Sequence, residues 1–138
     1  MEYRRIHTEH LDTLWEIHKL YKAEICECAP DDDKKTCLAD AMNREQILFY
    51  GAWDGDLLVG CCSVTVGFST FDYAPSGVLE DFFIRPEYRR RGIARQLVRF
   101  AYLTSGVRSL TVGCADCDTD MYRSLGFSIA LGNLLAME

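Results

Sequence analysis

Apolar residues recur along this chain with two different spacings, and the change from one to the other separates helices from strands. Spacings of three and four positions are typical of a helix with one buried face. They predict four helices, over residues 9–25, 33–42, 93–104 and 119–125. Alternating or continuous apolar runs predict strands over residues 3–6, 47–53, 57–68, 78–84, 109–113 and 127–131, and a last strand over 134–137.

The order of these elements, β-α-α-β-β-β-α-β-α-β, indicates the fold class. It predicts a mixed α/β fold with a central sheet of about six to seven strands flanked by about four helices. Asp54-Gly55 is a hairpin signal, and the nearly continuous apolar run from Leu57 to Val66 indicates a strand buried on both faces. A chain of 138 residues is expected to form one domain, spanning residues 1–138.

The stretch from Leu79 to Arg95 carries the clearest functional signal. An apolar run ends before Pro86, which has no N–H group with which to extend a strand. Three arginines and Gly92 follow, and helical spacing starts at Ile93. The start of a helix offers free N–H groups and a partial positive charge, and a glycine lets an anion approach the backbone. The stretch therefore predicts an anion site of the kind that binds phosphate.

The overall charge limits the partners of this chain. The formal net charge is −6, whereas nucleic-acid binding requires a basic surface, so no nucleic-acid partner is expected. No apolar run approaches the roughly 18 residues of a membrane span, and the N-terminal residues 1–5 lack the apolar core of an export signal. We therefore expect no membrane partner, and the local arginine cluster favours a small anionic ligand.

Seven cysteines, an odd number in a chain without an export signal, are interpreted as reduced thiols of a cytoplasmic protein. Cys114 and Cys117 have the spacing of a metal-binding pair, and Cys26 and Cys28 lie upstream. No histidine lies near either pair, so we expect no metal and interpret the cysteines as small packed thiols.

Two motifs give the chain a resemblance to the GCN5-related N-acetyltransferases, the GNAT superfamily. Residues 89–94, Arg-Arg-Arg-Gly-Ile-Ala, fit the family pattern Gln/Arg-x-x-Gly-x-Gly/Ala, and they lie between a strand and a helix as the family requires. Residues 122–127, Tyr-Arg-Ser-Leu-Gly-Phe, resemble its Tyr-x-x-x-Gly-Phe signature. The resemblance covers about residues 3–130. One departure is Ala115, where many relatives have an asparagine that contacts the cofactor.

The resemblance implies that acetyl-CoA is the co-substrate. Its pyrophosphate would lie on the backbone of residues 91–95, and its pantetheine arm would pair with the strand at 82–84 like an added strand. The N–H group of Ile84 would polarise the acetyl carbonyl. The expected cofactor-binding residues are Phe82, Phe83, Ile84, Arg89, Arg90, Arg91, Gly92, Ile93, Ala94 and Arg95.

Glu80 and Tyr122 are the candidate catalytic residues. Glu80 lies in an apolar strand, where burial would raise its pKa toward the range of a general base. Strand alternation would place it on one face with Phe82 and Ile84. Tyr122 would act as the general acid for the departing thiolate. A structural ion pair at Glu80 and a packed core position for Tyr122 are the alternatives.

The resemblance predicts an N-acetyltransferase in which a primary amine of a small molecule attacks the thioester directly. The segment 67–71, Gly-Phe-Ser-Thr-Phe, resembles the spermidine/spermine and diamine branch and suggests a polyamine or diamine acceptor. Acetylation of a protein or peptide, and a non-catalytic acyl-CoA sensor on the same fold, are the alternatives. Because members of the family often pair, a homodimer is also open.

Overall fold

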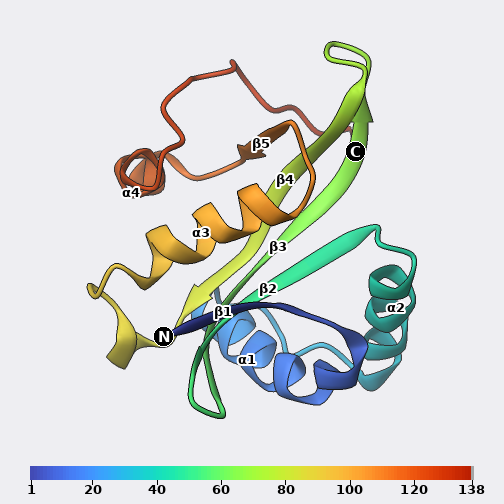
Figure 1. Cartoon of the computed structure of the whole chain (residues 1–138), viewed down its shortest axis with the longest axis vertical. Coiled ribbons are helices and arrows are strands. Elements are labelled where there is room, and N and C mark those ends of the chain that lie inside the picture. Colours follow the sequence, from blue (N-terminus) through green and yellow to red (C-terminus); the bar gives the residue numbers. More distant parts are fainter. Residues whose placement is uncertain (138) are drawn as a thin grey trace.

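The computed structural model describes residues 1–137 and shows one sheet with helices on both faces (Figure 1). The strands are β1 (Glu2–Ile6), β2 (Ile47–Asp54), β3 (Leu57–Ser69), β4 (Ala74–Ile84) and β5 (Ser109–Val112). They lie in the order β1-β2-β3-β4-β5, and only β4 and β5 are parallel to each other. The helices are α1 (Leu11–Glu24), α2 (Asp32–Asn43), α3 (Ile93–Thr104) and α4 (Thr119–Ser124).

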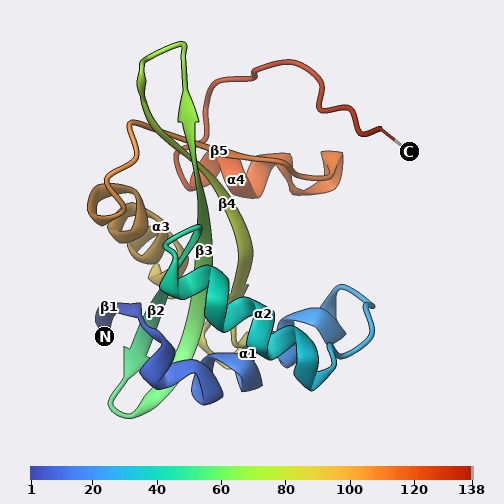
Figure 2. The same ribbon diagram turned by 90° about the vertical axis from the view of Figure 1, so that its right-hand side faces the viewer.

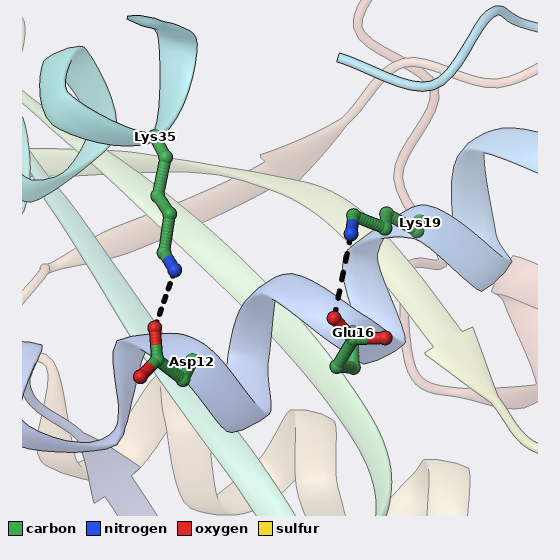
Figure 3. Close-up of polar contacts among 4 residues, drawn as sticks. All are labelled: Asp12, Glu16, Lys19 and Lys35. Carbon is green, nitrogen blue, oxygen red and sulfur yellow. Dashed lines mark hydrogen bonds and ion pairs between the residues drawn. The ribbon is translucent and has the colours of Figure 1, made fainter. Parts of the chain in front are cut away.

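Each face of the sheet has its own hydrophobic core. Helices α1 and α2 cover one face through Leu14, Ile17 and Met42, while α3 covers the other through Leu97 and Ala101 (Figures 1 and 2). An ion pair between Asp12 of α1 and Lys35 of α2 joins the two helices of the first face (Figure 3). Residues 58–64 of β3 are buried throughout, so the prediction of a strand covered on both faces is confirmed.

A β-bulge interrupts β4 at its centre. Ser63 pairs with Glu80, but Cys61 pairs with Phe83, so β4 has one more residue than β3 between these pairs. Asp81, within this interval, has a positive φ of 51°. Because the extra residue reverses the alternation of side chains, Leu79 and Ile84 lie in the same core although they are five positions apart.

Because of the bulge, the prediction that Glu80 shares a face of β4 with Phe82 and Ile84 is wrong. Glu80 lies opposite Ser63, on the face of α1, whereas Phe82 and Ile84 pack on the face of α3. The three residues therefore do not share a face. Glu80 is also exposed, so the expected burial of its carboxylate is wrong.

β4 and β5 separate after Leu79 and Val112, toward the C-terminal end of β4. The parallel pairing joins Ser76–Leu79 to Ser109–Val112 and ends there, so Glu80–Ile84 has no strand neighbour on that side. The Arg85 N–H donates to the Val59 carbonyl of β3 at 2.8 Å. Since N–H directions alternate along a strand, the Ile84 N–H points away from β3, into the opening between β4 and β5.

The sheet contains five strands, fewer than the predicted six to seven. Residues 127–131 and 134–137, both predicted as strands, form no regular structure within the described chain. A strand pattern becomes a strand only where a neighbouring edge supplies hydrogen bonds and a surface to cover the side chains. Among residues 1–137, no helix is long and apolar enough to cross a membrane.

Candidate active site

The predicted anion site lies between the end of β4 and the start of α3. A 3-10 turn at Pro86–Tyr88 leads into the arginines, and Gly92 precedes the first residue of α3, Ile93. Gly92 has a φ of 79°, and no atom beyond its two chain neighbours lies within 4 Å of the position that a Cβ would occupy there. Within residues 1–137 no side-chain hydrogen bond caps the helix, so its first N–H groups are left for another acceptor. The structure brings together the backbone elements that an anion site requires.

The four arginines predicted to bind the cofactor, Arg89, Arg90, Arg91 and Arg95, have different surroundings. Arg89 donates from Nε to the Ile84 carbonyl at 2.8 Å and forms an ion pair with Glu24 of α1 at 2.6 Å, and its guanidinium lies 5.5 Å from the centre of the Phe83 ring. The Arg89 side chain therefore links β4 to α1. The sequence motif could not reveal this, because Glu24 lies 65 positions away.

The remaining arginines are available to a ligand. The guanidinium of Arg91 lies over the ring of Tyr88 at 5.1 Å, while Arg90 and Arg95 are exposed. Among the described residues, none of these three forms an ion pair. Arg90, like Gly92, has a positive φ, of 62°, so the loop turns sharply on both sides of Arg91.

Helix α4 brings Tyr122 to the opening between β4 and β5. The Tyr122 ring lies 6.2 Å from that of Phe82 on β4 and 6.1 Å from that of Phe127. Burial raises the pKa of Tyr122, and the charges of Asp118 and Cys114 raise it further. The phenol therefore remains protonated at neutral pH and can donate a proton or a hydrogen bond. Two predicted site residues far apart in the sequence are thus neighbours in the structure.

The bulge places a second carboxylate beside Glu80. Asp81 is half-buried and accepts a hydrogen bond from the Ser63 hydroxyl at 2.6 Å. Sequence reasoning missed Asp81, although two adjacent acids inside an apolar strand were a visible signal. Glu80 is exposed, whereas Asp81 has a fixed hydrogen-bond partner.

Two side chains of α1 face this acidic region. Burial, followed by the charge of Asp81, raises the pKa of Tyr21 to about 12. His18 is buried beside it, and burial lowers the pKa of its imidazole. The sequence gives no sign that Tyr21 belongs to the site, because its position on the apolar face of a helix is also typical of the core.

The geometry suits an elongated ligand with an anionic end. Free N–H groups at the start of α3 lie at one end of the β4 edge, and Tyr122 faces that edge from α4. A chain of amide groups could pair with the β4 edge at Phe82 and with the Ile84 N–H, while the Ile84 carbonyl already accepts from Arg89. Within residues 1–137 no group of three or more His, Cys, Asp or Glu is arranged to hold a metal ion, and all seven cysteines are free.

Three solved structures resemble this fold over nearly the whole chain. The first is a probable acetyltransferase, with 21% identity, a TM-score of 0.84, and coverage of 100% of this chain and 99% of that chain. The second is the aminoglycoside acetyltransferase meta-AAC0020 from an uncultured soil metagenomic sample, in complex with sisomicin, at 16% identity and a TM-score of 0.85 over 99% and 94% of the two chains. The third is a predicted acetyltransferase from Clostridium acetobutylicum with acetyl-CoA, at 16% identity and a TM-score of 0.75 over 99% and 95%. These structural similarities show the fold.

No curated protein matches the sequence. The family evidence comes from residues 45–129, which match the family described as the acetyltransferase (GNAT) domain. This match includes β4, the loop with Gly92 and the Tyr122 signature. It confirms the prediction of an N-acetyltransferase. The chain belongs to the acetyltransferase (GNAT) domain family, which uses acetyl-CoA.

Proposed function

We propose that this protein transfers the acetyl group of acetyl-CoA to a primary amine of a small, positively charged molecule. The observation that carries the proposal is the free edge of β4, which lies between the unoccluded start of α3 and the Tyr122 ring. An edge of this kind can pair with the amide groups of a pantetheine arm, and the start of α3 can bind its pyrophosphate.

In this proposal the backbone N–H groups of residues 91–95 bind the pyrophosphate, assisted by the side chains of Arg90, Arg91 and Arg95. Arg89 would take part through its backbone, while its guanidinium holds the Ile84 carbonyl and Glu24. The predicted contacts of Phe82, Phe83 and Ile84 with the pantetheine arm remain part of the proposal. The direction of the Ile84 N–H supports those of Phe82 and Ile84, whereas alternation turns the Phe83 N–H toward β3.

Acetyl-CoA, when bound, supplies a thioester carbonyl that an amine can attack directly. The Ile84 N–H would donate a hydrogen bond to the carbonyl oxygen, on which negative charge develops. Tyr122, which is protonated at neutral pH, would donate a proton to the sulfur. Glu80 would accept the proton of the amine through a water molecule, a role that its exposure supports.

Acidic side chains favour a cationic acceptor. Glu80 and Asp81 lie on the α1 side of β4, and the chain as a whole carries a net charge of −6. Sisomicin, bound by the similar aminoglycoside acetyltransferase, belongs to the aminoglycosides. We propose polyamines, diamines and aminoglycosides as the acceptor classes to test first, with peptide amines as the second candidate.

We further propose a cytoplasmic location, which seven free cysteines favour. We propose a homodimer as well.

An assay of free-thiol release tests the function. Acetyl-CoA is incubated with the protein and with a panel of polyamines, diamines, aminoglycosides, amino acids and peptides, and each product is identified by mass. Turnover with polycationic small amines is the expected result. Turnover with peptides alone would assign the protein to peptide acetylation, and binding of acetyl-CoA without turnover on any amine would favour a sensor.

A further inference from the structure

The bulge of β4 decides which backbone groups of this strand face the opening between β4 and β5. Before the bulge, the Val78 carbonyl faces β3, where it accepts a hydrogen bond from Thr65 Oγ1 at 3.4 Å. After the bulge, the Arg85 N–H faces β3 and donates to the Val59 carbonyl at 2.8 Å. The N–H and C=O groups of one residue lie on the same side of a strand, and the sides alternate from residue to residue. Even-numbered residues therefore face β3 before the bulge, and odd-numbered residues face it afterwards.

This reversal exposes the backbone groups that the proposed function uses. With unbroken alternation, Phe82 and Ile84 would direct their N–H groups toward β3, as Val78 does. The one extra residue of β4 turns these two N–H groups into the opening instead. Pairing of a pantetheine arm with this edge therefore depends on the bulge at Asp81.

Asp81 is an unusual residue for its position in the bulge. Its φ of 51° lies in the left-handed region, where a Cβ atom crowds the backbone and glycine is favoured. A bulge with a left-handed first residue usually has a glycine there. Aspartate tolerates this conformation because its short polar side chain can form a local hydrogen bond. The contacts of the Asp81 side chain therefore bear on the shape of the strand.

Two buried side chains of β3 hold Asp81. Ser63 is fully buried and donates its hydroxyl to the Asp81 carboxylate at 2.6 Å. Cys61 is also fully buried, and its thiol donates to the Asp81 carbonyl at 3.6 Å. Burial, followed by the charge of Asp81, raises the pKa of the Cys61 thiol, so the thiol keeps its proton. A hydrogen bond to a charged acceptor is the stronger kind, so Ser63 contributes the larger part of this hold.

We propose that Ser63 is a positioning residue for acetyl transfer, because its hydroxyl fixes Asp81 in the left-handed conformation. The fixed bulge keeps the N–H groups of Phe82 and Ile84 turned toward the cofactor. Since Ser63 is fully buried, it acts through Asp81 and not by contact with a ligand. The inference rests on the proposed function, because it takes a pantetheine arm as the partner of the β4 edge.

Calorimetric titration with two ligands tests the proposal. Acetyl-CoA has an amide-bearing arm, whereas adenosine 3′,5′-bisphosphate offers phosphates without that arm. Ser63→Ala should raise the Kd of acetyl-CoA about tenfold, which corresponds to roughly one hydrogen bond, and leave the Kd of the bisphosphate unchanged. Thr65→Val is the matched control, because it removes another hydroxyl of β3 that donates to β4. It should change neither constant.

Two substitutions of Asp81 separate the shape of the bulge from the chemistry of the carboxylate. Glycine adopts a φ of 51° without a supporting hydrogen bond, whereas alanine does not. Asp81→Ala should therefore raise the Kd of acetyl-CoA about tenfold. The double variant Ser63→Ala/Asp81→Gly should recover the affinity that Ser63→Ala loses. Equal affinities of Asp81→Gly and Asp81→Ala overturn the inference, as does a Ser63→Ala variant with the affinity of the wild type.

Amide hydrogen exchange without any ligand distinguishes failure of this inference from failure of the proposed function. The Arg85 amide, which is bonded to β3 just beyond the bulge, should exchange about tenfold faster in Ser63→Ala and return to the wild-type rate in the double variant. Amides between β1 and β2 should keep their rates, which excludes a general loss of stability. A wild-type protein that binds no acetyl-CoA contradicts the proposed function, and the exchange rates then decide the role of Ser63. An Arg85 amide that does not respond to Ser63→Ala overturns that role.

Discussion

Arg89 and Glu24 form an ion pair at 2.6 Å between the arginine loop and the end of α1. The same guanidinium donates to the Ile84 carbonyl at 2.8 Å. Ile84 is the residue whose N–H points into the opening between β4 and β5. The first arginine of the family motif thus has a positioning role in this fold, because it holds the strand edge that would face the cofactor.

Arg89→Ala should therefore lower the free energy of unfolding by about 1–3 kcal/mol, since a charged hydrogen bond to a half-buried carbonyl and an ion pair are lost together. Urea denaturation measures the change. Arg95→Ala is the control, because Arg95 is exposed and forms no ion pair within residues 1–137, and its change should stay within about 0.5 kcal/mol. Equal stabilities of the two variants would contradict the positioning role.

Gly92→Glu should abolish the stabilisation of the protein by acetyl-CoA. The wild-type protein should gain about 2.7 kcal/mol at a ligand concentration roughly 100 times Kd, measured as a rise in melting temperature. The variant places a negative charge and a strained left-handed residue at the proposed pyrophosphate site. Gly106→Glu has the same φ of 79° and the same open surroundings, at the other end of α3. It should lose a similar amount of stability but retain the shift.

Tyr122→Phe should lower kcat by about 100-fold or more while the KM for acetyl-CoA changes little, because a general acid acts on the developing thiolate and not on the bound ground state. Steady-state kinetics separate the two parameters. Tyr102→Phe removes a hydroxyl that donates to the Arg108 carbonyl at 3.2 Å, and it should leave kcat unchanged. If Tyr122→Phe raises KM with an intact kcat, Tyr122 is a packing residue.

Glu80→Gln should reduce kcat/KM by about 10²–10⁴, as expected for loss of a general base. Glu87→Gln, an exposed acid in the turn after β4, is the control. The bulge makes Asp81→Asn an informative third variant. Loss of activity in Asp81→Asn with full activity in Glu80→Gln would assign the proton transfer to Asp81.

Tyr21 should make the protein less stable at high pH. Its pKa is about 12 in the folded chain, against an ordinary value of 10.0. Between these two values the unfolded chain has released a proton that the folded chain retains, so stability falls as pH rises. Tyr21→Phe should flatten this fall in urea titrations between pH 9 and pH 12, by up to about 1.4 kcal/mol for each unit of pKa difference. Tyr73→Phe, 76% exposed at the hairpin tip, should leave the slope unchanged.

Local patterns in the sequence were sufficient for most elements of the fold. The helical spacing after Gly92, the Asp54-Gly55 turn and the continuous apolar run of β3 each correspond to an element in the structure. These signals depend on residues within a few positions of one another, so they can be recognised in the sequence without the tertiary structure. The same locality explains why the acetyltransferase motif could be found in a short stretch.

Only the tertiary structure decided which side chains of the candidate site lie next to one another. The bulge at Asp81 depends on the register between β3 and β4, and it moved Glu80 to the other face. The partners of Arg89 and the ring beside Tyr122 come from distant parts of the chain. The sequence determined which backbone elements form and where an anion could bind. Register and long-range pairing were settled only by folding, because a local pattern does not specify which edge or side chain it will meet.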